Sequence, residues 1–384
     1  MAARGLLEGL EQKAHRIGAG AARELAGLDE TGAAKRALDI LGEAGLLAWC
    51  VPRSEGGADA SELCPADTVS VRALCTLRRA LAYHSGMLDV MGVMQGLGSF
   101  ALARAGDAAL RSQELPRVVR GERICAFALT EPGAGSSLGD VSTRAERTRA
   151  GWRLNGAKTF ITNAGIAHFY TLLARTSGQA GRSGHEGLSM FFVPADAAGV
   201  TATRFEVLAP HPIGDLSLTE VELPDDHLIG EQGAGLELAL ACLARFRTSV
   251  AAAAVGFARR ALDASRLHLK TRRQFGKPLS AFQGLAFDVA EMDTRLRASE
   301  LLVDEAAAAV DAGREATAEI ARAKLYATET ASWVCDRAVQ HHGGLGVKRG
   351  EIVERLFRDV RALRIYEGTS EIQKLILAKE LFGE

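Results

Sequence analysis

The stretch GWRLNGAKTFIT, residues 151–162, marks where the pattern of the chain becomes that of a β-sheet. It is rich in aromatic and β-branched residues, and its Asn155-Gly156 pair favours a tight two-residue hairpin turn. Short runs of the same type occupy the chain from about residue 123 to residue 228, with no helical period between them. We therefore predict a hairpin at Asn155-Gly156 within an antiparallel β-barrel or sandwich. The neighbouring runs are RICAFALT (123–130), FYTLLART (169–176), LSMFFVPA (188–195), VTATRFEV (200–207) and LSLTEVELP (216–224).

The sequence on either side of these runs has helical periodicity. AAKRALDILGEAGLLAW (33–49) is amphipathic, and other apolar helical stretches follow it up to about residue 122. Beyond about residue 231, four alanine-rich amphipathic segments are predicted, which is the number of an antiparallel helix bundle. The predicted fold class is α+β and mostly helical. The predicted domains are an N-terminal helical domain (1–122), a middle β-domain (123–230) and a C-terminal four-helix bundle (231–384).

The composition excludes several classes of partner. The 384 residues carry 46 basic and 47 acidic side chains, and a net charge of −1 gives no field that attracts nucleic acid or an anionic membrane. We find no run of about 18 apolar residues, so we expect no membrane span. The six cysteines are scattered without a CxxC pair, which favours reduced thiols. We therefore expect a cytoplasmic protein without nucleic-acid or membrane partners.

The common nucleotide and metal motifs are missing from the sequence. There is no GxGxxG after a strand and no GxxxxGK[ST], so neither a Rossmann site nor a P-loop is indicated. There is no HExxH, and the adjacent His341 and His342 cannot both face one metal ion from a helix. We expect no metal site.

The stretch RIYEGTSEIQK, residues 364–374, carries two glutamates four positions apart. Ser370 and Gln373 have the spacing of a capping box, which predicts a helix that begins at this point. Glu371 then lies in the first turn, where a carboxylate gains from the helix dipole. Glu367 precedes the helix, and the local pattern leaves open whether it is functional or a solvated loop acid.

Four motifs together carry a family resemblance. ALTEPGAGSS (128–137), KTFITNAG (158–165), RRQFGKPLSAFQ (272–283) and QHHGGLGV…RLFRDVRALRIYEGTSEIQ (340–373) stand in the order seen in the FAD-dependent acyl-CoA dehydrogenases, and the chain resembles that family over nearly its whole length. The resemblance implies a homotetramer in which an N-terminal helical domain, a middle β-domain and a four-helix bundle enclose FAD.

The resemblance also implies roles for individual residues. Phe127, Leu129, Thr130, Gly135, Ser136, Phe160 and Thr162 match the segments that contact the flavin ring and the pyrophosphate. Arg272, Gln274 and Phe275 resemble a segment that reaches the FAD of a neighbouring subunit, with Gln283, Gln340, Gly343 and Gly344 as further FAD contacts. Thr369 and Glu371 match the helix start beside the cofactor, while Ser136, Arg247 and Gly368 are implied substrate contacts.

By the same resemblance Glu367 is the catalytic base. Dehydrogenation of an acyl thioester to the 2-enoyl thioester removes a proton from Cα and a hydride from Cβ, which passes to flavin N5. A carboxylate with an ordinary pKa is a poor base for removing a proton from a carbon acid. Burial raises the pKa of a carboxylate and so makes it a stronger base. Some family members place the base directly before the residue that matches Arg247; here that position is Phe246, which accepts no proton. An electron-transfer flavoprotein is the implied electron acceptor.

Several departures from the family pattern leave the substrate and the reaction open. Ser137, the segment APHPIGDLS (209–217) and Ala244 differ from residues that are common near the CoA moiety. An acyl group on a carrier protein is therefore an alternative to acyl-CoA. Two further hypotheses are an O₂-using flavin oxidase or monooxygenase on the same fold, and a flavin-binding scaffold without turnover. The sequence indicates neither the acyl length nor the pathway.

Overall fold

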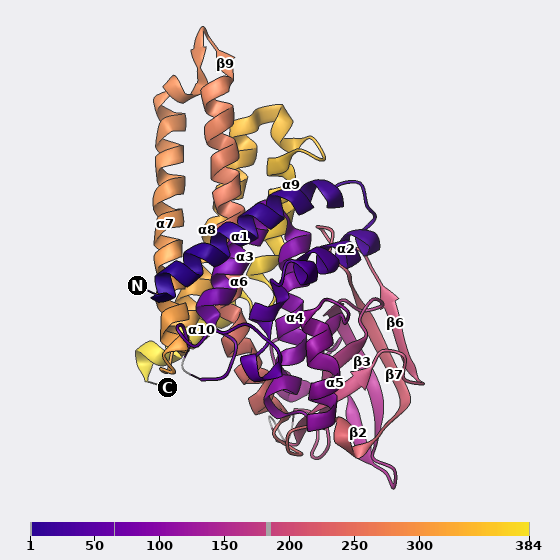
Figure 1. The fold of residues 1–384 in the computed structure, drawn as a ribbon. Coiled ribbons are helices and arrows are strands. Elements are labelled where there is room, and N and C mark those ends of the chain that lie inside the picture. Colours follow the sequence, from indigo (N-terminus) through magenta and orange to yellow (C-terminus); the bar gives the residue numbers. More distant parts are fainter. Residues whose placement is uncertain (1, 65, 182–185, 384) are drawn as a thin grey trace. The chain divides into compact units, whose positions relative to one another are not determined.

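The computed structural model describes residues 2–64, 66–181 and 186–383, and its elements follow the predicted order of helices, strands and helices (Figure 1). The predicted helical stretch 33–49 overlaps α2 and extends six residues beyond its end. Asp29, Ser70 and Asp107 cap α2, α3 and α5 by accepting hydrogen bonds from backbone N–H groups of the first turn. These helices are α1 (Ala2–Leu25), α2 (Glu30–Glu43), α3 (Val71–His84), α4 (Gly86–Ala105) and α5 (Ala108–Val119).

The middle of the chain forms one sheet with the strand order β6-β7-β3-β2-β4-β5-β8, and β1 pairs with β4. The sheet is mixed rather than wholly antiparallel as predicted, because β4 runs parallel to both β1 and β2 while the other pairs are antiparallel. The strands are β1 (Cys125–Ala128), β2 (Arg144–Arg147), β3 (Trp152–Thr162), β4 (Phe169–Arg175), β5 (Leu188–Pro194), β6 (Val200–Arg204), β7 (Ile213–Leu223) and β8 (Leu228–Ile229).

The predicted hairpin at Asn155-Gly156 is wrong, because β3 continues through both residues. Gly156 has φ +154°, and the pairing of β3 with β7 shifts register there, so the glycine marks a β-bulge. A Cβ at Gly156 would lie 2.5 Å from Thr143 Oγ1, so only glycine allows this approach of the neighbouring chain. The connection between β2 and β3 lies earlier, where Thr148 N donates to Gly151 O (2.8 Å).

Apolar side chains cover both faces of β4. Phe169 and Leu173 belong to a cluster that includes Leu102 of α4 and Leu115 of α5. Tyr170 and the alternate residues after it belong to a second cluster with residues of β3, β5 and β7. Because side chains alternate along a strand, the two clusters lie on opposite faces of the sheet. Helices α4 and α5 therefore cover one face.

The C-terminal part forms the four predicted long helices and one short helix, α9, that the sequence analysis did not include. A small two-stranded hairpin, β9 (Arg273–Gln274) and β10 (Lys277–Pro278), joins the ends of α6 and α7 (Figure 1). The helices are α6 (Gly235–Thr271), α7 (Gln283–Asp311), α8 (Thr317–His342), α9 (Ile352–Arg361) and α10 (Ser370–Phe382).

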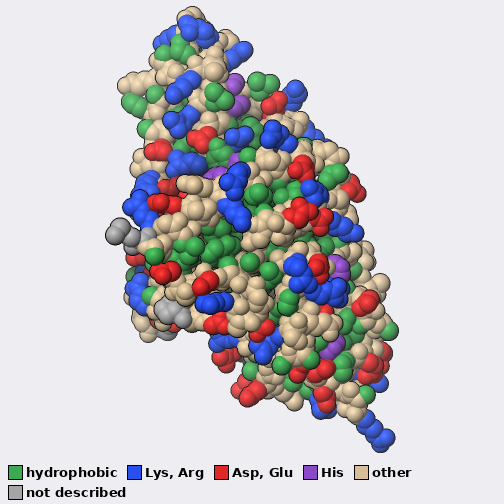
Figure 2. Space-filling model, in the orientation of Figure 1, with side chains coloured by type: hydrophobic (Ala, Val, Ile, Leu, Met, Phe, Trp, Pro, Cys, Tyr) green, Lys and Arg blue, Asp and Glu red, His purple; other side chains and the backbone are tan. Residues whose placement is uncertain are grey.

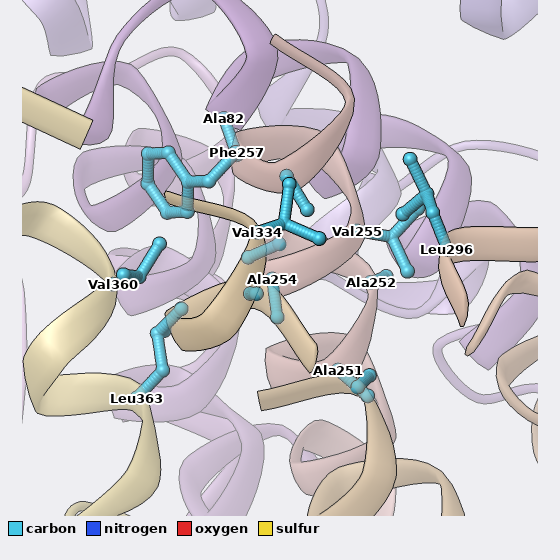
Figure 3. Close-up of a cluster of buried hydrophobic side chains, with 14 of the residues drawn as sticks. Ala82, Ala251, Ala252, Ala254, Val255, Phe257, Leu296, Val334, Val360 and Leu363 are labelled. Atoms are coloured by element: carbon cyan, nitrogen blue, oxygen red, sulfur yellow. The ribbon is translucent and has the colours of Figure 1, made fainter. Parts of the chain in front are cut away.

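The chain divides into two compact units. Unit 1 consists of residues 1–22, 70–89 and 245–384, and unit 2 of residues 23–69 and 90–244. The core of unit 1 gathers small residues of α6 against α3, α7, α8 and α9, and Figure 3 shows ten of its side chains labelled. Gly256 of α6 is required there, because a Cβ would lie 2.3 Å from Arg79 O of α3. The predicted three-domain division stays a prediction.

Among the residues that the structure describes, two helices are long and apolar enough to span a membrane by length and composition alone. They are α4 and α6, and 89% and 67% of their most apolar windows are buried inside the protein. Burial of that extent is typical of core helices.

Candidate active site

The two residues Glu367 and Gly368 form a tight turn just before α10. Glu367 has φ +54° and Gly368 has φ +90°, so both lie in the left-handed region. A non-glycine residue in that region costs about 1 to 3 kcal/mol and persists only where its surroundings hold it. The surroundings of this turn therefore determine where the Glu367 side chain lies.

Side chains from three helices of unit 1 hold the backbone carbonyls of this turn. Arg247 Nε of α6 donates to Glu367 O (2.8 Å). Lys324 Nζ of α8 donates to Gly368 O (2.7 Å), and Gln373 Nε2 of α10 donates to the same oxygen (2.9 Å). Two cations and one amide thus bind two consecutive carbonyls, which accounts for the left-handed turn.

The carboxyl group of Glu367 is left without such partners. Its Oε2 atom is buried and has no hydrogen-bond partner among the residues that the structure describes. Burial raises the pKa of Glu367, and the positive charges of Arg78, Arg247 and Lys324 only partly oppose this effect. Arg78 is itself held by Asp89, to which it donates two hydrogen bonds (2.8 and 2.7 Å). A carboxylate that is desolvated and unbonded is suited to accept a proton.

The predicted capping box at Ser370 and Gln373 is wrong by one residue. The N-cap of α10 is Thr369, whose side chain accepts from Ile372 N, and Ser370 is the first helical residue. Ser370 is buried, and its hydroxyl donates to Glu329 Oε1 (2.6 Å). Glu371 lies in the first turn of α10, as predicted, where a carboxylate gains from the helix dipole, and it is exposed.

The alternative position for the base, directly before Arg247 on α6, carries no acidic side chain. Phe246 of α6 is fully buried, and its neighbour Arg247 is partly buried rather than an exposed helix arginine. The predicted catalytic residue and three of its predicted neighbours, Gly368, Thr369 and Arg247, are therefore brought together in unit 1.

In unit 2 the structure brings together two of the predicted flavin segments. Thr159 N donates to Thr130 O (2.9 Å), and Lys158 Nζ donates to Leu129 O (3.0 Å). Lys158 also pairs with Glu131 (2.8 Å), and both side chains are buried. Burial alone would raise the pKa of Glu131, but Lys158 and the hydrogen bonds from residues 142 and 143 lower it to about 2. This ion pair fixes the start of the glycine-rich loop.

The surface of this part of unit 2 can accept a planar ring. Phe160 has φ +54° and is 61% exposed, although it lies within a strand. The Thr162 hydroxyl lies 2.8 Å from His211 Nε2, and Gly135 and Ser136 are exposed, with open space around Gly135. Phe127 is partly buried, and Leu129 is buried. An exposed aromatic ring and an exposed glycine-rich loop in the same unit fit an aromatic cofactor that carries phosphates.

The remaining predicted cofactor residues lie at the tip of the α6–α7 hairpin and at the end of α8. Phe275 has φ +51° and is 90% exposed, and Lys and Arg side chains gather at this tip (Figure 2). The rings of His268 and His342 stack at 4.2 Å, which joins the end of α6 to the end of α8. Exposed with Phe275 are Arg272, Gln274, Gln283, Gln340, Gly343 and Gly344.

The structure does not bring this tip to Glu367 within one chain. Arg247 lies on α6 and Arg272 directly follows its end, about 25 residues later, which is a distance of about 37 Å at 1.5 Å per residue. The tip residues therefore serve the same site as Glu367 only if they act on another copy of the chain.

Sequence reasoning missed Lys324, Arg78 and His211. Lys324 could have been found from its position, because it interrupts the buried face of α8 between Ile320 and Ala327. Among the described residues, no group of three or more His, Cys, Asp or Glu side chains is placed to hold a metal ion.

Comparison with known families identifies two regions of this chain. The family model described as "Acyl-CoA dehydrogenase, middle domain" matches residues 126–225, and "Acyl-CoA dehydrogenase, C-terminal domain" matches residues 233–382. The first region contains the predicted flavin segments of unit 2, and the second contains Glu367, Arg247 and Lys324.

Three relatives cover most of the chain. Cyclohexane-1-carbonyl-CoA dehydrogenase of Geobacter metallireducens is 34% identical over 350 residues, which covers 90% of this chain and 89% of the relative. Benzylmalonyl-CoA dehydrogenase of Aromatoleum aromaticum is 37% identical over 371 residues, 94% and 93% of the two chains. The caffeyl-CoA reductase-Etf complex subunit CarC of Acetobacterium woodii is 34% identical over 349 residues, 89% and 88% of the chains.

Solved structures have the same fold. Butyryl-CoA dehydrogenase from Megasphaera elsdenii matches with a TM-score of 0.88 and 28% identity, covering 98% of each chain. A structure described as the FAD complex of PigA matches with a TM-score of 0.87 and 25% identity, covering 98% of this chain and 97% of the other. The predicted fold class is confirmed.

Proposed function

Because this chain belongs to the acyl-CoA dehydrogenase family, we propose that it catalyses the FAD-dependent α,β-dehydrogenation of an acyl thioester to the 2-enoyl thioester. The observation that carries this proposal is the Glu367 carboxyl, which is desolvated, has a raised pKa and stands on a turn that other side chains hold by its backbone. A general base for a carbon acid needs these properties.

Glu367 is the group that takes the α-proton in this proposal. The proton leaves Cα for the Glu367 carboxylate, and the hydrogen on Cβ leaves with its electron pair. The rival position offers no carboxylate, because it is Phe246. Gly368 and Arg247 lie beside the base, and Ser136 is exposed on the loop of unit 2, which supports their proposed roles in binding the substrate.

FAD is the cofactor, and it supplies the acceptor for the electron pair that leaves Cβ. The residues present fit this group. Phe160 and Thr162 offer a ring and a hydroxyl to the isoalloxazine, and the exposed loop at Gly135 offers N–H groups to the pyrophosphate. The start of α10 at Thr369 offers the positive end of a helix dipole to phosphate oxygens.

CoA is the proposed carrier of the acyl group. The names of the three relatives describe CoA thioesters, and this supports CoA as the carrier here. A carrier-protein substrate is the second candidate, because Ser137, the 209–217 segment and Ala244 depart from residues common near CoA. The acyl group itself is not assigned.

The proposed electron acceptor is an electron-transfer flavoprotein, since one relative is named as a subunit of an Etf complex. The exposed tip with Arg272 and Phe275 supports a homo-oligomer, proposed as a tetramer, in which this tip contacts the FAD of another subunit. The six cysteines are buried and none is in a disulfide, which supports a proposed cytoplasmic location, where thiols stay reduced.

The proposal is tested by anaerobic bleaching of the purified yellow protein with a panel of acyl-CoAs and acyl-carrier proteins. We expect at least one acyl-CoA to bleach the flavin, and electrons to pass to an electron-transfer flavoprotein. Bleaching by carrier-bound acyl groups alone would favour the second candidate. Rapid O₂ consumption during turnover would favour an oxidase, and no bleaching by any thioester would contradict the proposal.

A further inference from the structure

Lys324 is a buried cation whose position the family assignment does not explain. Its side chain is fully buried in α8, on the same face as Ile320, Ala323 and Ala327. A buried lysine in an apolar stripe is disfavoured unless its ammonium group is hydrogen-bonded or paired with an opposite charge, because burial removes the group from water. The ammonium group donates to Gly368 O at 2.7 Å.

Lys324 acts on the turn together with a second cation from another helix. Arg247 of α6 binds the carbonyl of Glu367, and Lys324 of α8 binds the next carbonyl along the chain. Both contacts go to main-chain atoms of the two residues with positive φ. The two cations therefore fix the backbone of this turn without bonding the carboxylate that it carries.

We propose that Lys324 is a positioning residue for Glu367: it holds the Gly368 carbonyl, keeps the strained turn in its shape and places a positive charge beside the carboxylate. This inference rests on the proposed function, because it assigns Lys324 a role only if Glu367 is the base. Lys324 itself contacts no substrate atom in this account.

Several charged groups face this site, and they determine the sign of the expected effect. Glu367 is influenced by Arg78 on α3, Asp89 on α4, Arg247 on α6 and Lys324 on α8. The positive charge of Lys324 favours the ionised form of Glu367 and lowers its pKa. Removing that charge should therefore raise the pKa of Glu367, so that the carboxyl group stays protonated up to a higher pH.

The ammonium group of Lys324 is subject to opposing influences of its own. Burial lowers its pKa to about 8, and the charge of Arg247 acts in the same direction. The carboxylates of Glu367, Glu329 and Glu371 act in the opposite direction. Lys324 is therefore charged below about pH 8, which is the range in which its effect on Glu367 is measured.

The test compares four variants of the FAD-loaded protein with the wild type. Lys324→Met removes the charge and the donor but keeps the length of the side chain. Lys324→Arg keeps the charge and a donor. Arg322→Gln removes an exposed cation from the same helix and is the matched control. Glu367→Gln identifies the signals that belong to the base.

Two measurements are made on each variant. Stopped-flow reduction of FAD by a saturating acyl thioester is followed from acid to alkaline pH. The protonated-carboxyl infrared band that is missing in Glu367→Gln is titrated without substrate, so that this readout does not depend on turnover.

For Lys324→Met we expect the acid side of the pH profile of FAD reduction to move to higher pH by about one unit, and the infrared titration to move by the same amount. The plateau rate should fall by about 10- to 100-fold, because the turn is no longer held in place. Lys324→Arg should recover part of both effects, and Arg322→Gln should show neither. If Lys324→Met does not fold, Arg247→Met removes the other cation from the same turn and should move both readouts in the same direction.

The proposal is overturned if Glu367→Gln is inactive while Lys324→Met keeps the wild-type pH profile and infrared titration. Failure of the proposed function gives a different pattern, because Glu367→Gln would then bleach at the wild-type rate. An equal shift in Arg322→Gln would also overturn the proposal, because any cation on α8 would then have the same effect.

Discussion

Arg247 Nε lies 2.8 Å from the main-chain oxygen of Glu367, so a bundle helix holds the proposed base by its backbone and not by its carboxyl group. The guanidinium group is desolvated, which lowers the pKa of Arg247, and Glu367 acts in the opposite direction. The family resemblance implies a substrate contact for this arginine. The structure adds a second role, which mutation can separate from the first.

Arg247→Gln should lower the maximal rate of flavin reduction by about 10- to 100-fold, because the turn at Glu367 loses one of its donors. If Arg247 chiefly holds the turn, KM for the thioester should change little. If it chiefly binds the substrate, KM should rise while the rate at saturation stays close to that of the wild type. Arg266→Gln, on the exposed face of the same helix, is the control.

The raised pKa of Glu367 predicts a stability gain for Glu367→Gln. The pKa of Glu367 is higher in the native protein than in the unfolded chain, so the unfolded chain loses this proton at lower pH. The free energy of unfolding therefore falls as pH rises from the unfolded pKa to the native pKa of Glu367. Glu367→Gln should therefore melt at a higher temperature than the wild type at pH 8. The difference should shrink at low pH, where both states of the wild type are protonated. Calorimetry from acid to pH 8 measures this, and a lower melting temperature for the variant at pH 8 would count against a desolvated carboxylate.

The buried pair of Glu131 and Lys158 should support FAD binding from beneath the glycine-rich loop. Glu131→Gln keeps the shape but loses the charge that accepts from Lys158 Nζ and from Ser142 N and Oγ. Charge-assisted hydrogen bonds contribute about 1.5 to 3 kcal/mol, so we expect FAD to bind about 10- to 100-fold more weakly. Titration of the apoprotein with FAD by fluorescence measures the affinity. Affinity equal to that of the exposed control Glu122→Gln would contradict the role of the pair.

How much of this site the sequence predicted depends on whether a residue acts locally or across the fold. The order of elements, the position of Glu367 before α10 and the first-turn position of Glu371 follow from local patterns. The N-cap is Thr369 rather than Ser370, and the Ser370 hydroxyl instead donates to Glu329, 41 residues away on α8.

The prediction of a hairpin at Asn155-Gly156 failed because of a contact with a residue outside the local sequence. The local preference of this pair for a hairpin is overridden by the close approach of Thr143, which needs a residue without a Cβ. Lys324 and His211 act through contacts with residues that lie 44 and 49 positions away, and no local pattern encodes such partners. Burial, which sets the pKa of Glu367, also arises only when the helices of unit 1 pack.

The exposed tip of the α6–α7 hairpin should be an interface between copies of the chain. Arg272→Glu should weaken both assembly and FAD retention, since the tip lies about 37 Å along α6 from Arg247 and cannot serve the same site within one chain. Sedimentation velocity and the ratio of flavin to protein measure the two effects. A wild-type protein that sediments as a monomer and keeps all its FAD would contradict this prediction.

The assignment of the base to Glu367 is tested most directly by stopped-flow reduction of bound FAD with a saturating acyl thioester. Glu367→Gln should keep the fold and the flavin, and reduction should slow by at least about 10² to 10⁴-fold, the usual contribution of a general base. Glu371→Gln should weaken flavin binding modestly and, with excess FAD, reduce within several-fold of the wild-type rate. Exchange of the Cα proton in D₂O should be lost only in Glu367→Gln. Bleaching of Glu367→Gln near the wild-type rate, with loss of bleaching in Glu371→Gln, would contradict the account.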